Sequence, residues 1–368
     1  MMADQSHIEW TDATWNIITG CTLVSEGCRH CYAAKLAATR LANPPSRKGL
    51  ARQNAKGEYK FTGEVRFNEQ WLDQPLRWKR PRKIFVCAHG DLFHEGVSDD
   101  WLDQVFAVMA LCPQHVFQVL TKRPERMRAY FAGGALNRVW NAAVALDCQH
   151  HVANDEVGSF LLPADPKNPT WPLPNVWLGT SVEDQERADE RIPVLLDTPA
   201  AVRWISAEPL LGPVDLQSIK IACPNDPADC CGGQAYDDVL NRTTTCRACE
   251  GPEVWNGPRL DWVVVGGESG AGARPMHPDW ARSLRDQCKD AGVPFLFKQW
   301  GSNEPGELLD DGRDEPWRRW ASGEENWALS EYGKPKDSLA KWKFSNVGKA
   351  RAGRMLDGVE HNGYPVRP

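Results

Sequence analysis

Residues 261–269, DWVVVGGES, decide the fold class, because a continuously apolar run passes here directly into a short polar turn. Four apolar residues in a row, three of them β-branched, are typical of a strand buried on both faces of a parallel sheet. The turn that follows contains Gly266, Gly267 and Glu268. This stretch therefore predicts a buried parallel strand that ends at a polar site.

Six further runs of this kind are separated by stretches with helical spacing. The predicted strands are 14–19 (TWNIIT), 83–88 (KIFVCA), 115–120 (HVFQVL), 175–180 (NVWLGT), 202–206 (VRWIS), 261–266 (DWVVVG) and 294–299 (PFLFKQ). The predicted helices are 29–42, 68–78, 99–111, 136–146, 183–196 and 278–290. This alternation predicts an α/β fold, a partial or closed parallel βα (TIM-like) barrel over residues 1–300. A doubly wound open sheet is the alternative.

Polar side chains follow the predicted strands where each one ends. Asp91, Lys122, Ser181, Glu208 and Glu268 are the principal ones. In a parallel βα barrel these ends share one face, and active sites are built there. Each residue alone could also be a helix cap or a turn. Charges at most of the strand ends favour a shared site.

Composition restricts the class of protein. The 368 residues include 43 Lys+Arg, 49 Asp+Glu and 42% hydrophobic residues, with a net charge of −6, which excludes disordered, fibrous and generally basic proteins. No run reaches the roughly 18 apolar residues of a membrane-spanning helix, and the start does not resemble a signal peptide. We therefore expect a cytoplasmic protein, with no membrane partner, whose 12 cysteines are reduced and available to metals.

Three cysteines form the most specific local pattern, Cys21-TLVSEG-Cys28-RH-Cys31, directly after the first predicted strand. Cys28 and Cys31 are three residues apart, so one helical turn brings both thiols to the same side. Three thiolates would leave one iron of a four-iron cluster open to another ligand. Zinc held with His30 or a distant fourth group is an alternative. The remaining alternative is that the three cysteines are structural and bind no metal.

A three-cysteine loop after the first strand of a βα barrel resembles the radical S-adenosylmethionine (SAM) enzymes. The wider sequence is similar to a phage-associated family of that type, largely of unknown function and often encoded beside a three-Cys-motif partner protein. The segments concerned are IEWTDATWNIITGC (8–21), GDLFHEGV (90–97), LTKRPERM (120–127), WLGTSVEDQ (177–185), ISAEPLLGPV (205–214), VVGGESGAGARPMHP (264–278), FKQWG (297–301) and AGRMLDG (352–358). They span nearly the whole chain.

The resemblance implies a [4Fe–4S] cluster on the three cysteines, with SAM on the open iron. By position, it assigns Asp91 to the SAM amine, Lys122 to the SAM carboxylate and Ser181 to the ribose or carboxylate. Tyr32 matches the residue after the third cysteine in spore photoproduct lyase, a radical SAM enzyme of DNA repair. Tyr32 is therefore a candidate catalytic residue.

Two departures from the commonest radical SAM pattern concern spacing. Six residues, not three, separate Cys21 from Cys28, and a Gly-Gly-Glu sequence follows the sixth strand instead of the second. Gly266 and Gly267 are therefore expected to approach the adenine or substrate by backbone contact. Glu208 and Glu268 are the candidate catalytic carboxylates.

Residues 218–260 are predicted to form an inserted cysteine-rich module. Its cysteines are Cys223, Cys230, Cys231, Cys246 and Cys249. Four of them could enclose a structural zinc ion, as in a zinc ribbon, and an auxiliary iron–sulfur cluster is the alternative. Residues 301–368 are predicted to be an irregular extension packed on the barrel.

Two classes of function follow. The first is a radical SAM-like enzyme acting on a nucleic acid base or nucleotide, in phage DNA modification, repair or defence. The second is a non-catalytic, metal-stabilised binding protein that acts with a partner protein. The densest basic run, 77–83 (RWKRPRK), precedes a strand, away from the expected active face. Such runs are usually solvated surfaces.

Overall fold

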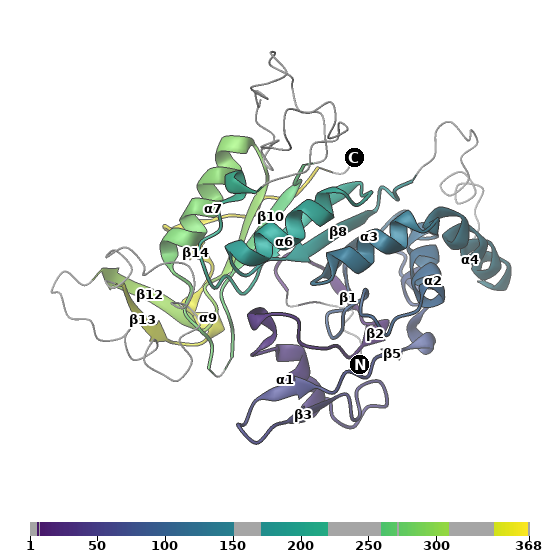
Figure 1. Ribbon diagram of the computed structural model, residues 1–368, viewed down its shortest axis with the longest axis horizontal. Coiled ribbons are helices and arrows are strands. Elements are labelled where there is room, and N and C mark those ends of the chain that lie inside the picture. Colours follow the sequence, from purple (N-terminus) through teal and green to yellow (C-terminus); the bar gives the residue numbers. More distant parts are fainter. Residues whose placement is uncertain are drawn as a thin grey trace, which may run out of the picture.

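Seven parallel strands form the centre of the computed structural model, which describes residues 6, 8–150, 171–219, 259–270, 272–308 and 342–366. The sheet curls into a half-barrel, so the fold is α/β and open on one side (Figure 1). In spatial order the strands are β1 (Ala13–Trp15), β6 (Lys83–Val86), β7 (Val116–Thr121), β8 (Val176–Ser181), β9 (Val202–Ala207), β10 (Trp262–Gly266) and β11 (Phe295–Gln299).

Spatial order follows chain order throughout this sheet. All six neighbouring pairs are parallel, with Val264 of β10 opposite Ser206 of β9 and Leu296 of β11. Right-handed crossovers between such strands place the helices on one face. These are α2 (Asp99–Ala110), α3 (Pro124–Ala132), α4 (Ala135–His150), α6 (Gln185–Leu196) and α7 (Pro278–Ala291) (Figure 1). Because the order never reverses among the described strands, the doubly wound alternative is wrong.

The first predicted strand is interrupted. Its residues form β1 and then β2 (Ile18–Thr19), which pairs antiparallel with β5 (Arg66–Phe67) outside the main sheet. Between them, the Asn16 side chain accepts a hydrogen bond from the backbone of His89, at 3.0 Å. The chain thus leaves the sheet at Asn16, which the continuous TWNIIT pattern does not reveal.

The helix predicted over 68–78 is wrong. This stretch forms two 3-10 turns, Glu69–Trp71 and Pro75–Arg77. Pro75 has no N–H, so it cannot donate to the Trp71 carbonyl four residues earlier. That carbonyl accepts the indole N–H of Trp15 instead, at 2.8 Å. An α-helix is therefore interrupted at the proline.

Three further differences concern short elements. The helix predicted over 29–42 is restricted to α1 (Tyr32–Ala38), and the hairpin of β3 (Ala51–Gln53) and β4 (Tyr59–Phe61) was not predicted. Helix α3 was also missed, although Pro124 at its first turn is a recognised helix-start signal. Short elements give little periodicity, so their patterns are weak.

Two separate apolar clusters stabilise the half-barrel. The larger lies between the sheet and the helices. The smaller fills the concave face with aromatic side chains, including Trp10, Phe85, Trp177, Trp204 and Trp262. The ring centroids of Trp10 and Trp204, and of Trp204 and Trp262, are each 5.2 Å apart. Because Trp10 lies before β1 and Trp177, Trp204 and Trp262 lie in the amino-terminal halves of their strands, the carboxyl-terminal half of the concave face stays open.

A substitution at Gly179 of β8 tests the packing of this aromatic cluster. A Cβ atom there would lie 2.5 Å from the Trp204 ring, so Gly179→Ala is expected to destabilise the protein by about 1–3 kcal/mol. Urea unfolding measures the change. In Gly179→Ala/Trp204→Phe, the smaller ring should restore part of the loss. An unchanged unfolding midpoint in the single variant would contradict this packing.

The C-terminal residues pack against the last strand. They contain β12 (Asn303–Leu308), β13 (Trp342–Asn346), α9 (Lys349–Ala352), β14 (Met355–Leu356) and β15 (Val359–Glu360). Residues 361–363 then run along β11, where the Phe297 amide donates to the His361 carbonyl at 3.0 Å. The Tyr364 ring lies 5.3 Å from Trp262. This part of the chain therefore covers the free edge of the sheet.

Other parts of the prediction lie outside the described residues. These are Cys223, Cys230, Cys231, Cys246 and Cys249, almost all of the 218–260 module, and residues 309–341 of the extension. Across the described residues, no helix has both the length and the apolar character needed to cross a lipid bilayer.

Candidate functional site

A cavity of about 480 Å³ opens at the carboxyl ends of the strands. Its volume lies within the roughly 300–1,000 Å³ of small-molecule sites. Residues at or just beyond the carboxyl ends of the strands line it together: Cys21, Asp91, Lys122, Ser181, Glu208, Glu268 and Lys298. The structure thus brings together side chains that the sequence places at separate strand ends.

The cavity has an apolar floor and a polar mouth. Trp10 and Phe85 of the aromatic cluster, with Leu120 packed against it, form part of the floor. Tyr59 and Phe61 of β4 add two more aromatic side chains to the wall. A ligand would therefore contact apolar surface below and charged groups above.

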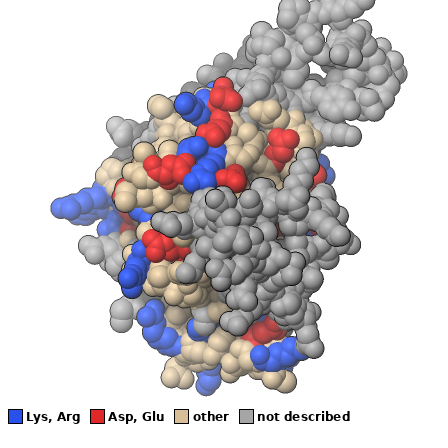
Figure 2. All heavy atoms as spheres, turned by 90° about the vertical axis from the view of Figure 1, so that its left-hand side faces the viewer, with Lys and Arg blue, Asp and Glu red and all other residues tan. Residues whose placement is uncertain are grey.

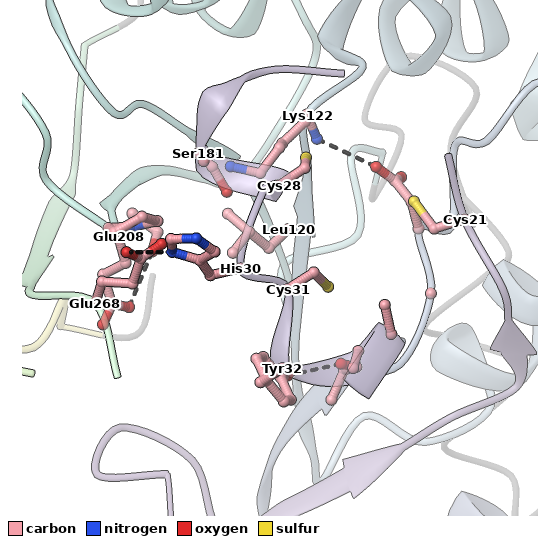
Figure 3. A pocket seen from close by; sticks show the side chains of 18 of the residues that line it. Cys21, Cys28, His30, Cys31, Tyr32, Leu120, Lys122, Ser181, Glu208 and Glu268 are labelled. Carbon is pink, nitrogen blue, oxygen red and sulfur yellow. Dashed lines mark hydrogen bonds and ion pairs between the residues drawn. The ribbon is translucent and has the colours of Figure 1, made fainter. Parts of the chain in front are cut away.

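All three cysteines of the loop line this cavity (Figure 3). Cys21 follows β2, Cys28 ends the 3-10 turn Glu26–Cys28, and Cys31 immediately precedes α1. The three thiols are free and partly buried. As they stand, no three or more histidine, cysteine, aspartate or glutamate side chains of the described residues are gathered to hold a metal ion.

Buried Arg123 connects the cysteine loop to the end of β7. It donates to Asp91 at 3.0 Å and to the Thr22 hydroxyl at 2.5 Å, and the same guanidinium lies 3.6 Å from the Cys21 sulfur. Burial, with the negative charge of Asp91, raises the pKa of the Cys21 thiol to about 12, while the positive charge of Arg123 lowers it. Arg123 is therefore the side chain placed to stabilise a Cys21 thiolate.

Glu183 anchors the middle of the same loop. Its fully buried carboxylate accepts a hydrogen bond from Ser25 at 2.9 Å and forms ion pairs with Lys122 and Arg191. Burial alone would raise the pKa of Glu183, but the two cations lower it overall. A Cβ atom on Gly27 would lie 2.4 Å from the carboxylate, so glycine permits this close approach. The six residues between Cys21 and Cys28 thus include Ser25 and Gly27, through which the loop contacts Glu183.

Glu268 anchors the third part of the loop. Its carboxylate forms a hydrogen bond with His30 Nδ1 at 3.0 Å. It also accepts hydrogen bonds from three N–H groups of Arg274, at 2.6 to 2.9 Å. Burial would raise the pKa of Glu268, but the contacts with His30 and Arg274 lower it to about 2. Glu268 therefore stays ionised, which suits a positioning residue for His30 better than an acid catalyst.

Replacing Glu268 by glutamine is expected to alter the pH dependence of stability. A carboxyl whose folded-state pKa is depressed contributes stability above about pH 4.5, and this contribution disappears as the pH falls toward about 2. The stability advantage of the wild type over Glu268→Gln should therefore shrink by roughly 3 kcal/mol across that range. Unfolding at several pH values measures it. Exposed Glu304→Gln serves as the control, and a constant difference would contradict the assignment.

Asp91 is saturated by its surroundings. One carboxylate oxygen accepts from the Phe93 amide and the Thr121 hydroxyl, and the other from the Lys122 amide and the Arg123 guanidinium, all within 3.2 Å. A carboxylate has about four such acceptor positions. Asp91 therefore supports the ends of β6 and β7 and has little capacity left for a ligand amine.

The other predicted ligand contacts differ in availability. Lys122 lines the cavity but is paired with Glu183, so one of its three donors is occupied. Ser181 also lines the cavity, at the end of β8 (Figure 3). Tyr32 lines it as well, while its hydroxyl donates to the Ala88 carbonyl at 2.6 Å. These three side chains share one cavity with the cysteines.

The far wall of the cavity is built by β9, β10 and β11. Glu208 forms an ion pair with Lys298 at 2.9 Å and accepts from the Ser206 hydroxyl at 3.0 Å. Gly267 lines the cavity, whereas Gly266 lies beside Glu208, where a Cβ atom would come within 2.4 Å of the carboxylate. Gly266 thus makes room for a side chain, and Gly267 alone of the two faces the cavity.

Sequence reasoning placed Arg123 and Glu183 at strand ends but assigned no role to the residues that connect the loop to the sheet. Arg123, Glu183 and Arg274 are all nearly fully buried and contact the loop. They stand beside motifs already noted, in LTKRPERM, SVEDQ and GARPMHP. The signal that identifies these residues is that their charged side chains are buried, and burial can be seen only in the tertiary structure.

The surface carries both signs of charge. Figure 2 shows Lys and Arg intermingled with Asp and Glu on one face. In the basic run, Arg77 pairs with Asp73 at 2.9 Å and Arg82 lies over the Trp78 ring at 4.7 Å. These contacts fit a solvated surface with local pairing.

Comparisons with known proteins give one match. A sequence model of the family described as "Protein of unknown function (DUF5131)" matches residues 5–365. The chain therefore belongs to this family. Comparison with curated proteins gave no match. Comparison with solved structures gave none either.

Proposed function

We propose that this member of the DUF5131 family is a radical SAM-type iron–sulfur enzyme that acts on a nucleic acid base or nucleotide. The observation that supports this most is that Cys21, Cys28 and Cys31 all line one cavity at the carboxyl ends of a parallel half-barrel. In this proposal the half-barrel is a partial TIM-like barrel.

The donor set supports the proposal by the number and kind of its ligands, since three thiols in one cavity are what a four-iron cluster with one open iron needs, once they close around it. Three free thiols on a loop attached to the strand ends would hold three irons. Bound there with SAM, the cluster would supply one-electron cleavage of SAM to methionine and a 5′-deoxyadenosyl radical. Lys122 and Ser181 are the cavity residues we assign to SAM. Asp91 is assigned instead to support Arg123, because its acceptor positions are filled.

The chain's own residues contribute position, charge and exclusion of water. Arg123 places a positive charge beside Cys21, and Glu183 and Glu268 hold the loop at Ser25 and His30. The apolar floor limits water beneath the reacting groups. Exclusion of water and orientation are the usual contributions of a protein to cofactor chemistry.

A base or nucleotide as substrate is supported by the lining of the cavity. Tyr59 and Phe61 offer aromatic faces on which a base can stack, and Lys60 between them in the chain offers positive charge for a phosphate. Aromatic side chains interleaved with lysines are typical of sites for nucleotides and single strands.

Anaerobic reconstitution with iron and sulfide tests the proposal. We expect about four irons per chain, visible absorbance of a cluster, and SAM-derived 5′-deoxyadenosine after addition of a reductant. Protein that binds only zinc and leaves SAM intact would favour the alternative, a metal-stabilised binding protein acting with a three-Cys-motif partner protein.

Lys122→Ala separates SAM binding from cluster binding. Loss of a charged donor to the SAM carboxylate should weaken SAM binding roughly tenfold or more. Iron content should stay unchanged, because the Lys122 amine is not a metal ligand. Equilibrium dialysis of reconstituted protein measures the first quantity and iron analysis the second. An equal loss of iron would contradict the assignment to SAM.

A further inference from the structure

The carboxylates that line the cavity differ in their remaining capacity to bind a ligand. Among the described residues they are Asp91, Glu208 and Glu268. Asp91 and Glu268 each accept four hydrogen bonds. Glu208 has one contact on each oxygen, from Lys298 and Ser206. Because a carboxylate has about four acceptor positions, each Glu208 oxygen can accept one more hydrogen bond.

Glu208 stands where a substrate would be presented to the cysteine loop. In Figure 3, Glu208 and Cys21 lie at opposite sides of the pocket, with Cys28 and Cys31 between them in this view. Lys298 lines the cavity beside Glu208 and holds it at 2.9 Å. The pair therefore offers, side by side, two acceptor positions and an ammonium donor.

These groups select a ligand edge with two adjacent N–H donors followed by a carbonyl oxygen. Guanine has this edge, at its 2-amino group, N1–H and O6. Adenine offers a single donor beside an acceptor, and thymine or uracil offers one donor between two carbonyls. An arginine guanidinium would fit the carboxylate but would be repelled by the positive charge of Lys298.

We propose that Glu208 and Lys298 form a subsite for a guanine base. The carboxylate receives N1–H and the 2-amino group, Lys298 donates to O6, and Tyr59, Phe61 and Phe85 supply aromatic surface in the same cavity. This subsite rests on the proposed function, since it names the base that such an enzyme would take.

Equilibrium dialysis of the full chain without reconstituted cluster tests the subsite, with GMP, IMP and AMP as probes. IMP differs from GMP only in lacking the 2-amino group, and all three carry the same phosphate. We expect GMP to bind roughly tenfold or more tightly than IMP, because IMP leaves one charged acceptor unpaired. AMP should bind more weakly than GMP. Equal binding of GMP and IMP, or no binding of GMP, would overturn the proposal.

Two variants identify the residues. Glu208→Gln replaces one acceptor by a donor, so the preference for GMP over IMP should disappear. The affinity for AMP should rise relative to the affinity for GMP. Lys298→Met should weaken GMP binding roughly tenfold. Lys349→Met is the matched control, because Lys349 also lines the cavity and pairs with a glutamate, Glu9, at 3.0 Å. Retained GMP preference in Glu208→Gln, or equal losses in the two lysine variants, would contradict the assignment.

The two proposals fail in different ways. Iron binding and SAM cleavage without discrimination between GMP and IMP would overturn the guanine subsite and leave the radical SAM function supported. Selective GMP binding by a protein that never binds iron would support the subsite and contradict the enzyme function. Circular dichroism of each variant checks that the fold is retained.

Discussion

Cys28→Ala is expected to remove cluster binding and SAM cleavage together. With only two thiolates left in the loop, the cluster loses one of its three protein ligands while one iron is already open. Iron and sulfide per chain should fall close to the level of unreconstituted protein, and 5′-deoxyadenosine should become undetectable. Anaerobic reconstitution followed by metal analysis and chromatography of the SAM products measures both quantities.

Cys148 supplies the matched control for this experiment. It is also a free cysteine, but it is exposed on α4 and does not line the cavity. Cys148→Ala should therefore reconstitute like the wild type. If Cys28→Ala keeps its iron and still cleaves SAM, the loop does not hold the cluster, and the radical SAM proposal is wrong.

Glu183→Ala should cause the largest loss of stability of the changes considered. The substitution leaves buried Arg191 without its carboxylate and removes the contact with Ser25. Breaking a buried ion pair in this way costs about 3–5 kcal/mol. Urea or thermal unfolding measures the loss. Glu183→Gln should lose less, because the amide still accepts a hydrogen bond from Ser25.

Glu186 gives the control for this change, three residues further along the chain. Its ion pair with Arg187 is partly exposed, so Glu186→Ala should change stability by less than about 1 kcal/mol. A second readout concerns the loop. In Ser25→Ala, which removes this contact and keeps the Glu183–Arg191 pair, reduced iron uptake would show that the Ser25 contact positions the cysteines. Equal stability of Glu183→Ala and Glu186→Ala would mean that the buried pair is not a significant stabilising contact.

The regular elements were predictable because their signals are local. The run around Val263 is apolar without interruption, as a strand covered on both faces must be, and it forms β10. Ser98 accepts a hydrogen bond from the amide of Trp101 and Gly292 adopts a left-handed conformation (φ 67), as start and stop signals should. The failure at 68–78 is also local in origin, since Pro75 prevents the helix that the apolar spacing suggested.

The protonation and hydrogen bonding of the site residues were harder to predict from the sequence, because each side chain depends on partners far along the chain. Asp91, Glu208 and Glu268 look equivalent as acidic residues after strands. Their difference lies in the number of donors around each, and several of these donors come from distant parts of the chain: Thr121 and Lys122 for Asp91, Lys298 for Glu208 and His30 for Glu268. Hydrogen bonding and burial set the protonation and capacity of a carboxylate, and neither is visible in one segment.

The amino-acid sequence by itself determined the order of strands and helices along the chain and the spacing of the three cysteines, since hydrophobic periodicity and residue spacing act over a few neighbours. Only the tertiary structure decided that the cysteine loop is held by Arg123, Glu183 and Glu268. The Ser25–Glu183 and His30–Glu268 contacts join residues 158 and 238 positions apart. Such pairs form because parallel strands end at one face, which is a property of the folded sheet.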